Sequence, residues 1–492
     1  MEILNRGLAW LSTHYLGGVP VDRIATVVAV LLSYVLAHVY RRIPASSSGR
    51  YKHLYSIASS AVLFGVVQEQ YWGMVHLLCG ALAAYALMAA LRGRAMVAAV
   101  FVVAMAHMSY SHIRRQLAEA AAAENGGYVI FDHTGAQMVF VIKVTSLAWC
   151  IEDGRQPPAQ LSAYQRKNAI AALPSLLEFL GYLFFFPGLA VGPAFELATY
   201  RRMVQLDSIR TMRTQTPRAY RKLAEGFVWM AVYVVYGARL TFPFMATDKF
   251  SAAYPWYASR MLYLCAAGVV ARAAYYTAWK MSEGACIVAG LGFDGAEGGA
   301  DSEAKGGAQW MDIANVHVRE VELGTSLKQL IDGWNIGTNT WLRHHVYLRI
   351  LQLSPKRGAA AAALSTFLVS AWWHGFYPGY YLTFVLGTIA SNAARTLRRS
   401  LNPLVALGPD HSSASSRKRF TKRVYDVAGW ALSKYTLDFI VTPFMTLSLS
   451  ASLRAWGSHY FAVPVGVLAI NVIFNVIGVG RLLRTRTHAK NN

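Results

Sequence analysis

The chain has 492 residues, of which 55% are hydrophobic and only 15% are charged. The charged share lies well below the roughly 25% that is usual for a soluble domain. The formal net charge of +22 does not indicate nucleic-acid binding, because the basic residues stand in short loops between apolar runs. The composition therefore predicts an all-α, polytopic integral membrane protein and excludes a separate soluble domain of useful size.

About ten apolar runs approach the roughly 20 residues that a membrane-spanning helix needs. In chain order they are residues 24–40, 54–67, 72–91, 95–111, 227–246, 256–279, 359–373, 377–394, 427–449 and 461–479. The first run follows an N-terminal stretch without a small-residue cleavage site, so we expect a retained span. Residues 114–127 are rich in Ala and Glu, which predicts a short amphipathic helix outside the bilayer.

Lys and Arg mark the cytoplasmic loops of a polytopic protein. The basic stretches are residues 41–52, 201–222, 395–423 and 481–490. Even numbers of spans separate the last three, so all three can lie on the cytoplasmic side, and residues 482–492 are predicted to form a cytosolic basic tail. Three apolar stretches lie between residues 94 and 201, which predicts that one is a re-entrant hairpin or an interfacial helix.

Several common site types are missing from the sequence. Its four cysteines stand singly, without CxxC spacing, which favours small core residues over disulfides or zinc ligands. There is no HExxH, no glycine-rich phosphate loop followed by Lys, and no G-x-S-x-G elbow. Proteolysis, nucleotide hydrolysis and serine-hydrolase chemistry are therefore not expected.

The first candidate site is the stretch SAWWHGFYPGYY at residues 370–381, which places His374 between two apolar runs. Ionisable groups inside a membrane usually face a cavity and mark a functional site. A buried, neutral imidazole can accept a proton near pH 7. A lone histidine can equally hydrogen-bond two helices together, but Gly375, Pro378 and Gly379 break the helix here, and broken helices at membrane depth line cavities. The aromatic neighbours Trp372, Trp373, Phe376 and Tyr377 are suited to contact substrate or to anchor the chain at the membrane interface.

The second candidate site lies in a polar but aromatic region, residues 310–350. From Ser326 onward, apolar residues at i, i+3, i+4 and i+7 predict an amphipathic helix; they are Leu327, Leu330, Ile331 and Trp334. It leads into DGWNIGTNTWLRHHVY at residues 332–347. Asn335 can donate to an oxyanion or hold a base or substrate in register. Asn335 can equally be a helix cap or a turn residue.

Basic side chains follow Asn335. Arg343 and Arg349 can bind the phosphates of a nucleotide-type cofactor, or they can extend to lipid headgroups. His344 and His345 are adjacent, so on a helix they point about 100° apart and do not readily serve one metal.

Together these residues resemble the signature of the membrane-bound O-acyltransferase family. The first motif of that signature is matched by Trp334, Asn335, Thr338, Trp341, Leu342, Arg343, Val346 and Tyr347. The second is matched by Ser370, Ala371, Trp373, His374, Gly375, Pro378, Gly379, Tyr380 and Tyr381. Residues 131–154 and 185–200 are similar to the branch of the family that acylates lysophospholipids. The resemblance spans most of the chain.

The resemblance implies a single membrane-embedded acyltransferase domain over residues 1–492, with a catalytic motif region at 310–381. It implies about ten to eleven transmembrane helices, with re-entrant and amphipathic helices around a central reaction chamber. His374 and Asn335 would be the catalytic residues. Substrate and acyl-coenzyme A would be bound by Trp334, Thr338, Trp341, Arg343, Tyr347, Trp373 and Tyr377.

The implied reaction moves a fatty acyl group from acyl-coenzyme A to the free hydroxyl of a lysophospholipid. It needs no metal or cofactor besides acyl-coenzyme A as co-substrate. The expected partners are acyl-coenzyme A, lysophospholipid and membrane lipid, without nucleic acid, and the implied location is the endoplasmic reticulum membrane. Alternative acceptors are a sterol, diacylglycerol or a protein. A transporter would spread polar residues over several spans, whereas here they cluster, and a scaffold would leave the broken histidine region unexplained.

Overall fold

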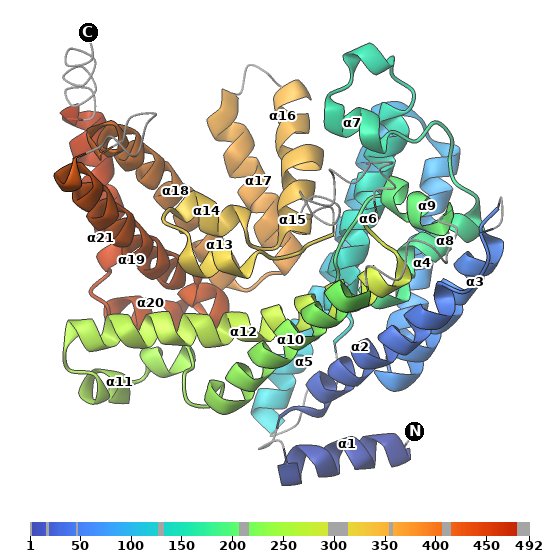
Figure 1. Cartoon of the computed structure of the whole chain (residues 1–492), viewed down its shortest axis with the longest axis horizontal. Helices are drawn as coiled ribbons and strands as arrows, with labels where there is room; N and C mark the ends of the chain where they lie inside the picture. The colour runs from blue at the N-terminus through green and yellow to red at the C-terminus, as the bar shows by residue number, and fades with distance from the viewer. Residues whose placement is uncertain are drawn as a thin grey trace. The chain divides into compact units, whose positions relative to one another are not determined.

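The computed structural model describes residues 2–15, 19–45, 48–125, 132–205, 216–293, 313–353, 358–405 and 415–479. All regular secondary structure in these residues is helical and none of it is strand, which confirms the all-α class. The chain forms two compact units, and Figure 1 labels their helices. The predicted tail at residues 482–492 lies outside the described residues, and the assignment of a single domain stays a prediction.

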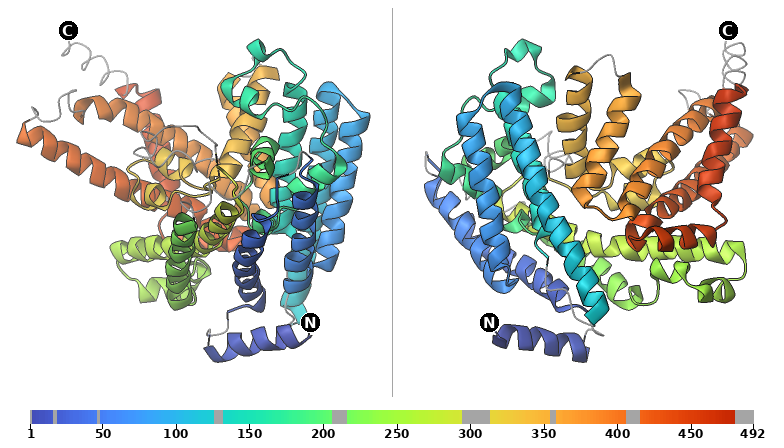
Figure 2. Two further views of the ribbon diagram at one scale, coloured as in Figure 1. Left: turned by 45° about the vertical axis from the view of Figure 1, so that its right-hand side comes forward. Right: turned by 180° about the vertical axis from the view of Figure 1, so that it is seen from behind.

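The first unit comprises residues 1–235, 273–316 and 336–346. Its α-helices are α1 (Glu2–Tyr15), α2 (Val21–Tyr40), α3 (Arg50–Ser60), α4 (Tyr71–Ala90), α5 (Gly93–Asn125), α6 (Thr134–Asp153), α7 (Ala163–Asn168), α8 (Leu176–Leu183), α9 (Leu197–Gln205), α10 (Thr216–Tyr236) and α15 (Ile336–Trp341). Shorter 3₁₀ or π turns are η1 (Ala61–Val67), η2 (Pro158–Gln160), η3 (Phe186–Gly188) and η7 (Leu342–Tyr347), the last of which ends in the second unit. Helix α5 packs beside α4 and α6, as the rear view of Figure 2 shows for α4.

The second unit comprises residues 236–272, 317–335 and 347–492. Its α-helices are α11 (Asp248–Ala253), α13 (Val318–Leu323), α14 (Leu327–Asp332), α16 (Leu348–Leu353), α17 (Gly358–His374), α18 (Pro378–Val405), α19 (Ser416–Thr446), α20 (Leu449–Gly457) and α21 (Ala462–Asn471). Shorter turns are η4 (Pro243–Ala246) and η9 (Val472–Val476). Helix α12 (Tyr257–Ala289) begins in this unit and ends in the first.

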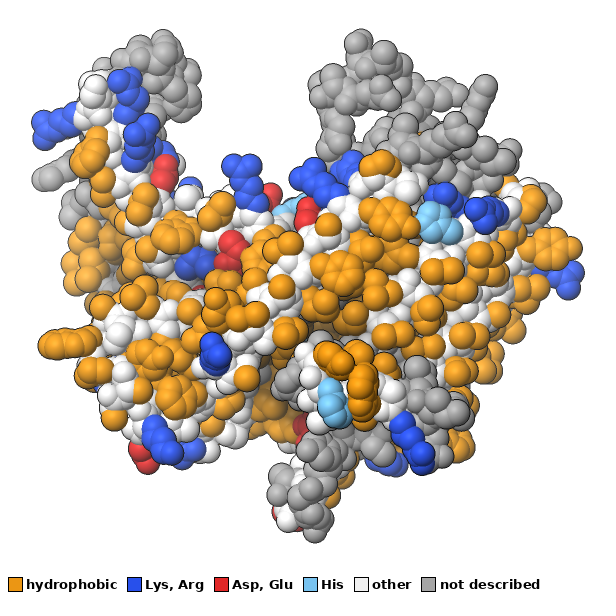
Figure 3. Space-filling model, turned by 60° about the horizontal axis from the view of Figure 1, so that its bottom comes forward, with side chains coloured by type: hydrophobic (Ala, Val, Ile, Leu, Met, Phe, Trp, Pro, Cys, Tyr) orange, Lys and Arg blue, Asp and Glu red, His pale blue; other side chains and the backbone are white. Residues whose placement is uncertain are grey.

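The apolar helices fit a membrane protein. Within the described residues, five helices are long and apolar enough to span a membrane: α2, α4, α5, α6 and α12. A sixth span is counted if Leu449–Gly457 and Ala462–Phe474, which meet at 78°, form one broken span. Large apolar side chains lie exposed on α2 and α4, for example Val35 and Val75, and apolar side chains cover much of the face in Figure 3.

Three expectations about helix boundaries are wrong. The run at 227–246 is not one helix, because α10 ends at Tyr236 and η4 begins only at Pro243. Residues 114–125 extend α5 and form no separate helix, since their helix-forming residues continue the ladder begun at Gly93. The predicted helix from Ser326 through Trp334 ends at Asp332, although Ser326 does cap it by accepting from the Gln329 N–H.

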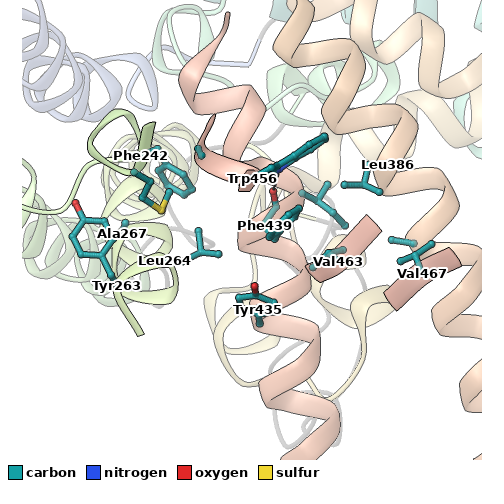
Figure 4. Packing of buried hydrophobic residues seen from close by; sticks show 14 of the residues in the cluster. Phe242, Tyr263, Leu264, Ala267, Leu386, Tyr435, Phe439, Trp456, Val463 and Val467 are labelled. Atoms are coloured by element: carbon teal, nitrogen blue, oxygen red, sulfur yellow. Dashed lines mark hydrogen bonds between the residues drawn. The ribbon is translucent and has the colours of Figure 1, made fainter. Parts of the chain in front are cut away.

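A hydrophobic core fills the second unit. It joins η4 and α11 with α12, α18, α19, α20 and α21 (Figure 4). Phe439 stacks on Trp456 with the ring centroids 5.5 Å apart, and the Trp456 Nε1–H donates to the Phe439 carbonyl at 3.0 Å. This core packs α19 against α18, the helix that begins at Pro378, shortly after His374.

Helix α18 closely approaches the end of α19 at Gly379. The Gly379 N–H donates to the Leu447 carbonyl at 2.8 Å, and a Cβ added there would lie 2.0 Å from the Pro443 oxygen. The Thr383 hydroxyl donates to the Ile440 carbonyl at 3.0 Å, one turn further along α18. Glycine at 379 is therefore required by backbone contact.

We predict that Gly379→Ala destabilises the second unit by about 1–3 kcal/mol, because a backbone oxygen cannot yield as a side chain can. The thermal unfolding midpoint of the purified protein should fall. Gly387→Ala, on the same helix, is the matched control: its nearest neighbour would be 3.6 Å away, so its midpoint should stay equal or rise. Equal midpoints for the two variants would contradict the close approach.

Candidate active site

His374 is the last residue of α17 and lies half-buried among aromatic rings. Its ring stacks on Phe384 at 5.3 Å and meets Phe444 edge-on at 4.9 Å and Trp373 at 4.7 Å between centroids. Tyr380 lies at 5.7 Å. These contacts come from α17, α18 and α19, so the second unit itself builds the surroundings of the imidazole.

The helix stops at His374 for a local reason. Gly375 has φ 123°, in a region that favours glycine, and its N–H still donates to the carbonyls of Ala371 and Trp372 at 3.2 and 3.0 Å. Helix α18 then begins with Pro378, which is well suited to a first helical position because it lacks an N–H. The sequence prediction of a helix break beside the histidine is confirmed.

Asn335 stands between α14 and α15 in the left-handed backbone region, with φ 43°. Asn is one of the few residues other than Gly that visits this region readily. Among the described side chains, none forms a hydrogen bond with the Asn335 carboxamide, and the residue is half-buried. The left-handed asparagine thus follows the end of α14, and its amide remains available to a ligand.

The remaining predicted binding residues fall in both units. Trp334, Tyr347 and Tyr377 are half-buried and Trp373 is buried; all four belong to the second unit. Thr338, Trp341 and Arg343 belong to the first unit, where Thr338 and Trp341 are buried and Arg343 is exposed. Of these residues, Trp373 packs directly against His374. The substrate contacts of the whole set stay a prediction.

Trp341 already has a polar partner inside the first unit. Its Nε1–H donates to the Thr145 hydroxyl of α6 at 2.9 Å, and only 2% of the residue is exposed. This contact anchors α15 on α6 and gives the tryptophan a packing role.

A half-buried carboxylate, Glu196, lies next to this segment, and the sequence assigned it no role of its own. Glu196 accepts from the Tyr164 hydroxyl at 2.8 Å and contacts His345 Nε2 at 3.0 Å and Cys150 Sγ at 3.5 Å. Tyr164 also stacks on His344 at 3.7 Å. Burial alone would raise the pKa of Glu196, but His345, Tyr164 and Cys150 together hold it below its ordinary value. The signal in the sequence is its place within residues 185–200, the stretch similar to the lysophospholipid-acylating branch.

Cys150, Glu196 and His345 also have metal-binding chemistry, since one ligand atom from each lies within 4.8 Å of the others. Their observed contacts are hydrogen bonds that converge on the carboxylate. The His345 Nδ1 has no partner among the described residues, whereas metal-bound histidines usually donate through the second nitrogen. The geometry thus fits a hydrogen-bonded carboxylate better than a metal centre.

His133, to which the sequence assigned no role, lies in a polar cluster of the first unit. The His76 and His107 rings stack at 3.8 Å, and His133 lies 5.1 Å from His76. Ser111 and Gln137 supply hydrogen bonds of 2.9 Å to His76 and His107, respectively. These contacts join α4, α5 and α6.

His374 at the end of a helix and Asn335 in the preceding motif are the two residues that the family signature in the sequence singled out. Comparison with known proteins identifies the family. The family described as "MBOAT, membrane-bound O-acyltransferase family" matches residues 122–416. The chain belongs to the membrane-bound O-acyltransferase family. Membership confirms the resemblance seen in the sequence, and it establishes a multi-pass membrane protein of the acyltransferase class.

Relatives of known name match nearly the whole chain. A protein of Schizosaccharomyces pombe named "Lysophospholipid acyltransferase" is 33% identical over 471 residues, covering 93% of this chain and 87% of its own. The protein of the same name from Saccharomyces cerevisiae is 29% identical, covering 93% and 74%. Human "Membrane-bound glycerophospholipid O-acyltransferase 1" is 28% identical, covering 90% and 87%.

We predict that Glu196→Gln lowers the stability of the first unit by about 1–3 kcal/mol, because at least one buried donor loses its acceptor. The difference should be present above the ordinary pKa of 4.5 and should shrink as the pH falls below it, because the folded pKa is lowered. Thermal unfolding of the two proteins at several pH values measures this. Glu152→Gln, whose partner is the neighbouring Arg155, is the control and should change little.

Proposed function

We propose that this acyltransferase moves a fatty acyl group from acyl-coenzyme A to the free hydroxyl of a lysophospholipid. The observation that carries the proposal is His374 at a helix break, inside an aromatic enclosure. The names of the relatives support a lysophospholipid acceptor. The proposed location is the endoplasmic reticulum membrane, as the resemblance to the family implied.

The proposed reaction begins with proton transfer to His374. A neutral imidazole nitrogen accepts the proton of the glycerol hydroxyl while the oxygen attacks the thioester carbonyl carbon. A C–O bond forms, the C–S bond breaks, and the imidazolium returns its proton to the departing thiolate. The products are a diacyl phospholipid and free coenzyme A, so atoms and charges balance without a metal or prosthetic group.

Asn335 is proposed to act on the charge that develops during attack. A carboxamide N–H directed at the carbonyl oxygen stabilises an oxyanion. In other enzymes, losing one such donor lowers the rate by about 10²- to 10³-fold. Two observations support this role: the amide has no hydrogen-bond partner among the described residues, and the backbone is held in a left-handed conformation. Backbone conformations of this kind cluster at functional sites.

We predict that His374→Ala lowers kcat by about 10²- to 10⁴-fold while the protein still accumulates in membranes. Membranes containing each protein would receive labelled acyl-coenzyme A and a panel of lysolipids, sterol and diacylglycerol. Labelled diacyl phospholipid should form with the unaltered chain and at least about 10²-fold more slowly with the variant. Full activity in the variant would refute the base, and product from sterol or diacylglycerol alone would refute the acceptor.

Asn335 requires a pair of variants, because its side chain and its backbone conformation are both unusual. Asn335→Gly removes the amide without backbone strain, whereas Asn335→Ala removes it and adds about 1–2 kcal/mol of left-handed strain. We predict that both lose about 10²-fold in kcat and that only the Ala variant also loses thermal stability. Retained activity in Asn335→Gly would show that Asn335 is merely a turn residue.

A further inference from the structure

Four charged side chains meet inside the second unit, away from the contacts of His374. The Arg272 guanidinium donates twice to Glu322, from Nε to Oε1 at 2.8 Å and from Nη2 to Oε2 at 3.2 Å. Lys434 Nζ donates to Glu322 Oε2 at 2.6 Å, and Arg272 Nη1 donates to Asp438. At most 16% of any of these side chains is exposed, and none of Asp438 is. We call this set the ion network.

Stability alone does not explain the ion network. Buried ion pairs cost so much desolvation that apolar replacements are often neutral or better, whereas removing one partner leaves an unpaired buried charge. Burial would raise the pKa of Glu322, yet Arg272 and Lys434 lower it to about 2. The charges of the two cations and the two carboxylates balance. Their hydrogen bonds also fix the orientation of the side chains, which an apolar cluster does not do.

On one side the ion network holds the segment that leads to Asn335. Glu322 lies in α13, and its carbonyl also accepts from Trp430 Nε1 of α19 at 2.8 Å. The Arg398 guanidinium donates to the Thr325 carbonyl at 3.2 Å, just before α14. After α14, the Gly333 carbonyl accepts from the His317 N–H at 2.9 Å. These bonds close residues 317–333 into a compact turn from which Asn335 follows directly.

On the other side the same helix supports His374. Lys434 and Asp438 lie on α19, which further on carries Phe444 against the imidazole. The carbonyl of Leu447, just after α19, accepts from Gly379, in the turn that follows His374. Because α19 is common to both sets of contacts, a shift at the ion network moves the two proposed catalytic residues relative to each other.

We propose that Glu322, held by Arg272, Lys434 and Asp438, is a positioning residue for acyl transfer that sets Asn335 against the reaction at His374. This inference rests on the function proposed above. Misplacement by about 1 Å can cost on the order of 10²-fold in rate without abolishing binding. The ion network is thus expected to govern kcat more than KM.

The first test compares Glu322→Gln with Glu322→Asp in the full-length protein. Glu322→Gln should lower kcat about 10- to 100-fold with little change in KM for either substrate. Glu322→Asp keeps the charge and should recover part of the loss. Asp426→Asn removes an ion pair with Lys422 on the more exposed part of α19 and should leave kcat unchanged. A loss confined to KM, or equal for Gln and Asp, would overturn the proposal.

The second test asks whether Glu322 acts through Asn335. In the Asn335→Gly background, Glu322→Gln should cost little further activity, because the group that it positions is already gone. A structural defect would instead lower activity by the same factor in both backgrounds, in step with the folded fraction, and would overturn the proposal. If the unaltered protein acylates no lysophospholipid, the proposed function fails. If it does so and Glu322→Gln is fully active, only the positioning role fails.

Discussion

Backbone N–H and C=O groups inside a membrane protein need partners within the protein, because the hydrocarbon layer supplies none. The chain breaks its helix immediately after His374 and therefore has to meet that requirement locally. The Gly375 N–H donates to carbonyls at the end of α17, and the Gly379 N–H donates to the Leu447 carbonyl just after α19. Pro378, between them, has no N–H to satisfy. The imidazole thus lies at a helix end where the N–H groups of both glycines have backbone partners.

This solution makes α19 central to the second unit. The helix accepts hydrogen bonds from α18, presents Phe444 to the histidine and bears two members of the ion network. It also packs into the hydrophobic core through Tyr435, Phe439 and Ile440. Its apolar face secures its position, and the buried charges of Lys434 and Asp438 fix its orientation. The second unit therefore couples packing to the geometry of the proposed reaction.

Much of this was predictable from local sequence rules. Gly and Pro after His374 predicted the helix break, and the apolar runs predicted most of the long helices, because both are short-range properties of the chain. The end of α14 was mispredicted, since the apolar spacing continues to Trp334 while the backbone at Asn335 turns left-handed. A periodic pattern records which face is buried and cannot record a change of backbone region.

Charged residues within apolar runs were the least predictable part. Arg272 and Asp438 each lie in a run that was read as a span, and Glu322 is far from both in sequence. Their pairing is a tertiary property, as is the contact of Glu196 with His345. What the sequence does provide is the charge itself, which is costly in such a run unless it has a partner.

The central claim is that His374 and Asn335 act in the same acyl-transfer step, His374 on the acceptor hydroxyl and Asn335 on the thioester carbonyl. The most direct measurement is a cryo-electron microscopy structure of the protein in a lipid nanodisc with a non-hydrolysable thioether analogue of acyl-coenzyme A and a lysophospholipid. The account predicts that the acceptor hydroxyl lies within about 3 Å of a His374 nitrogen. It also predicts that the Asn335 amide lies within hydrogen-bond reach of the place that the carbonyl oxygen of the natural thioester would occupy. A ligand bound with its reacting atoms remote from either residue would contradict it.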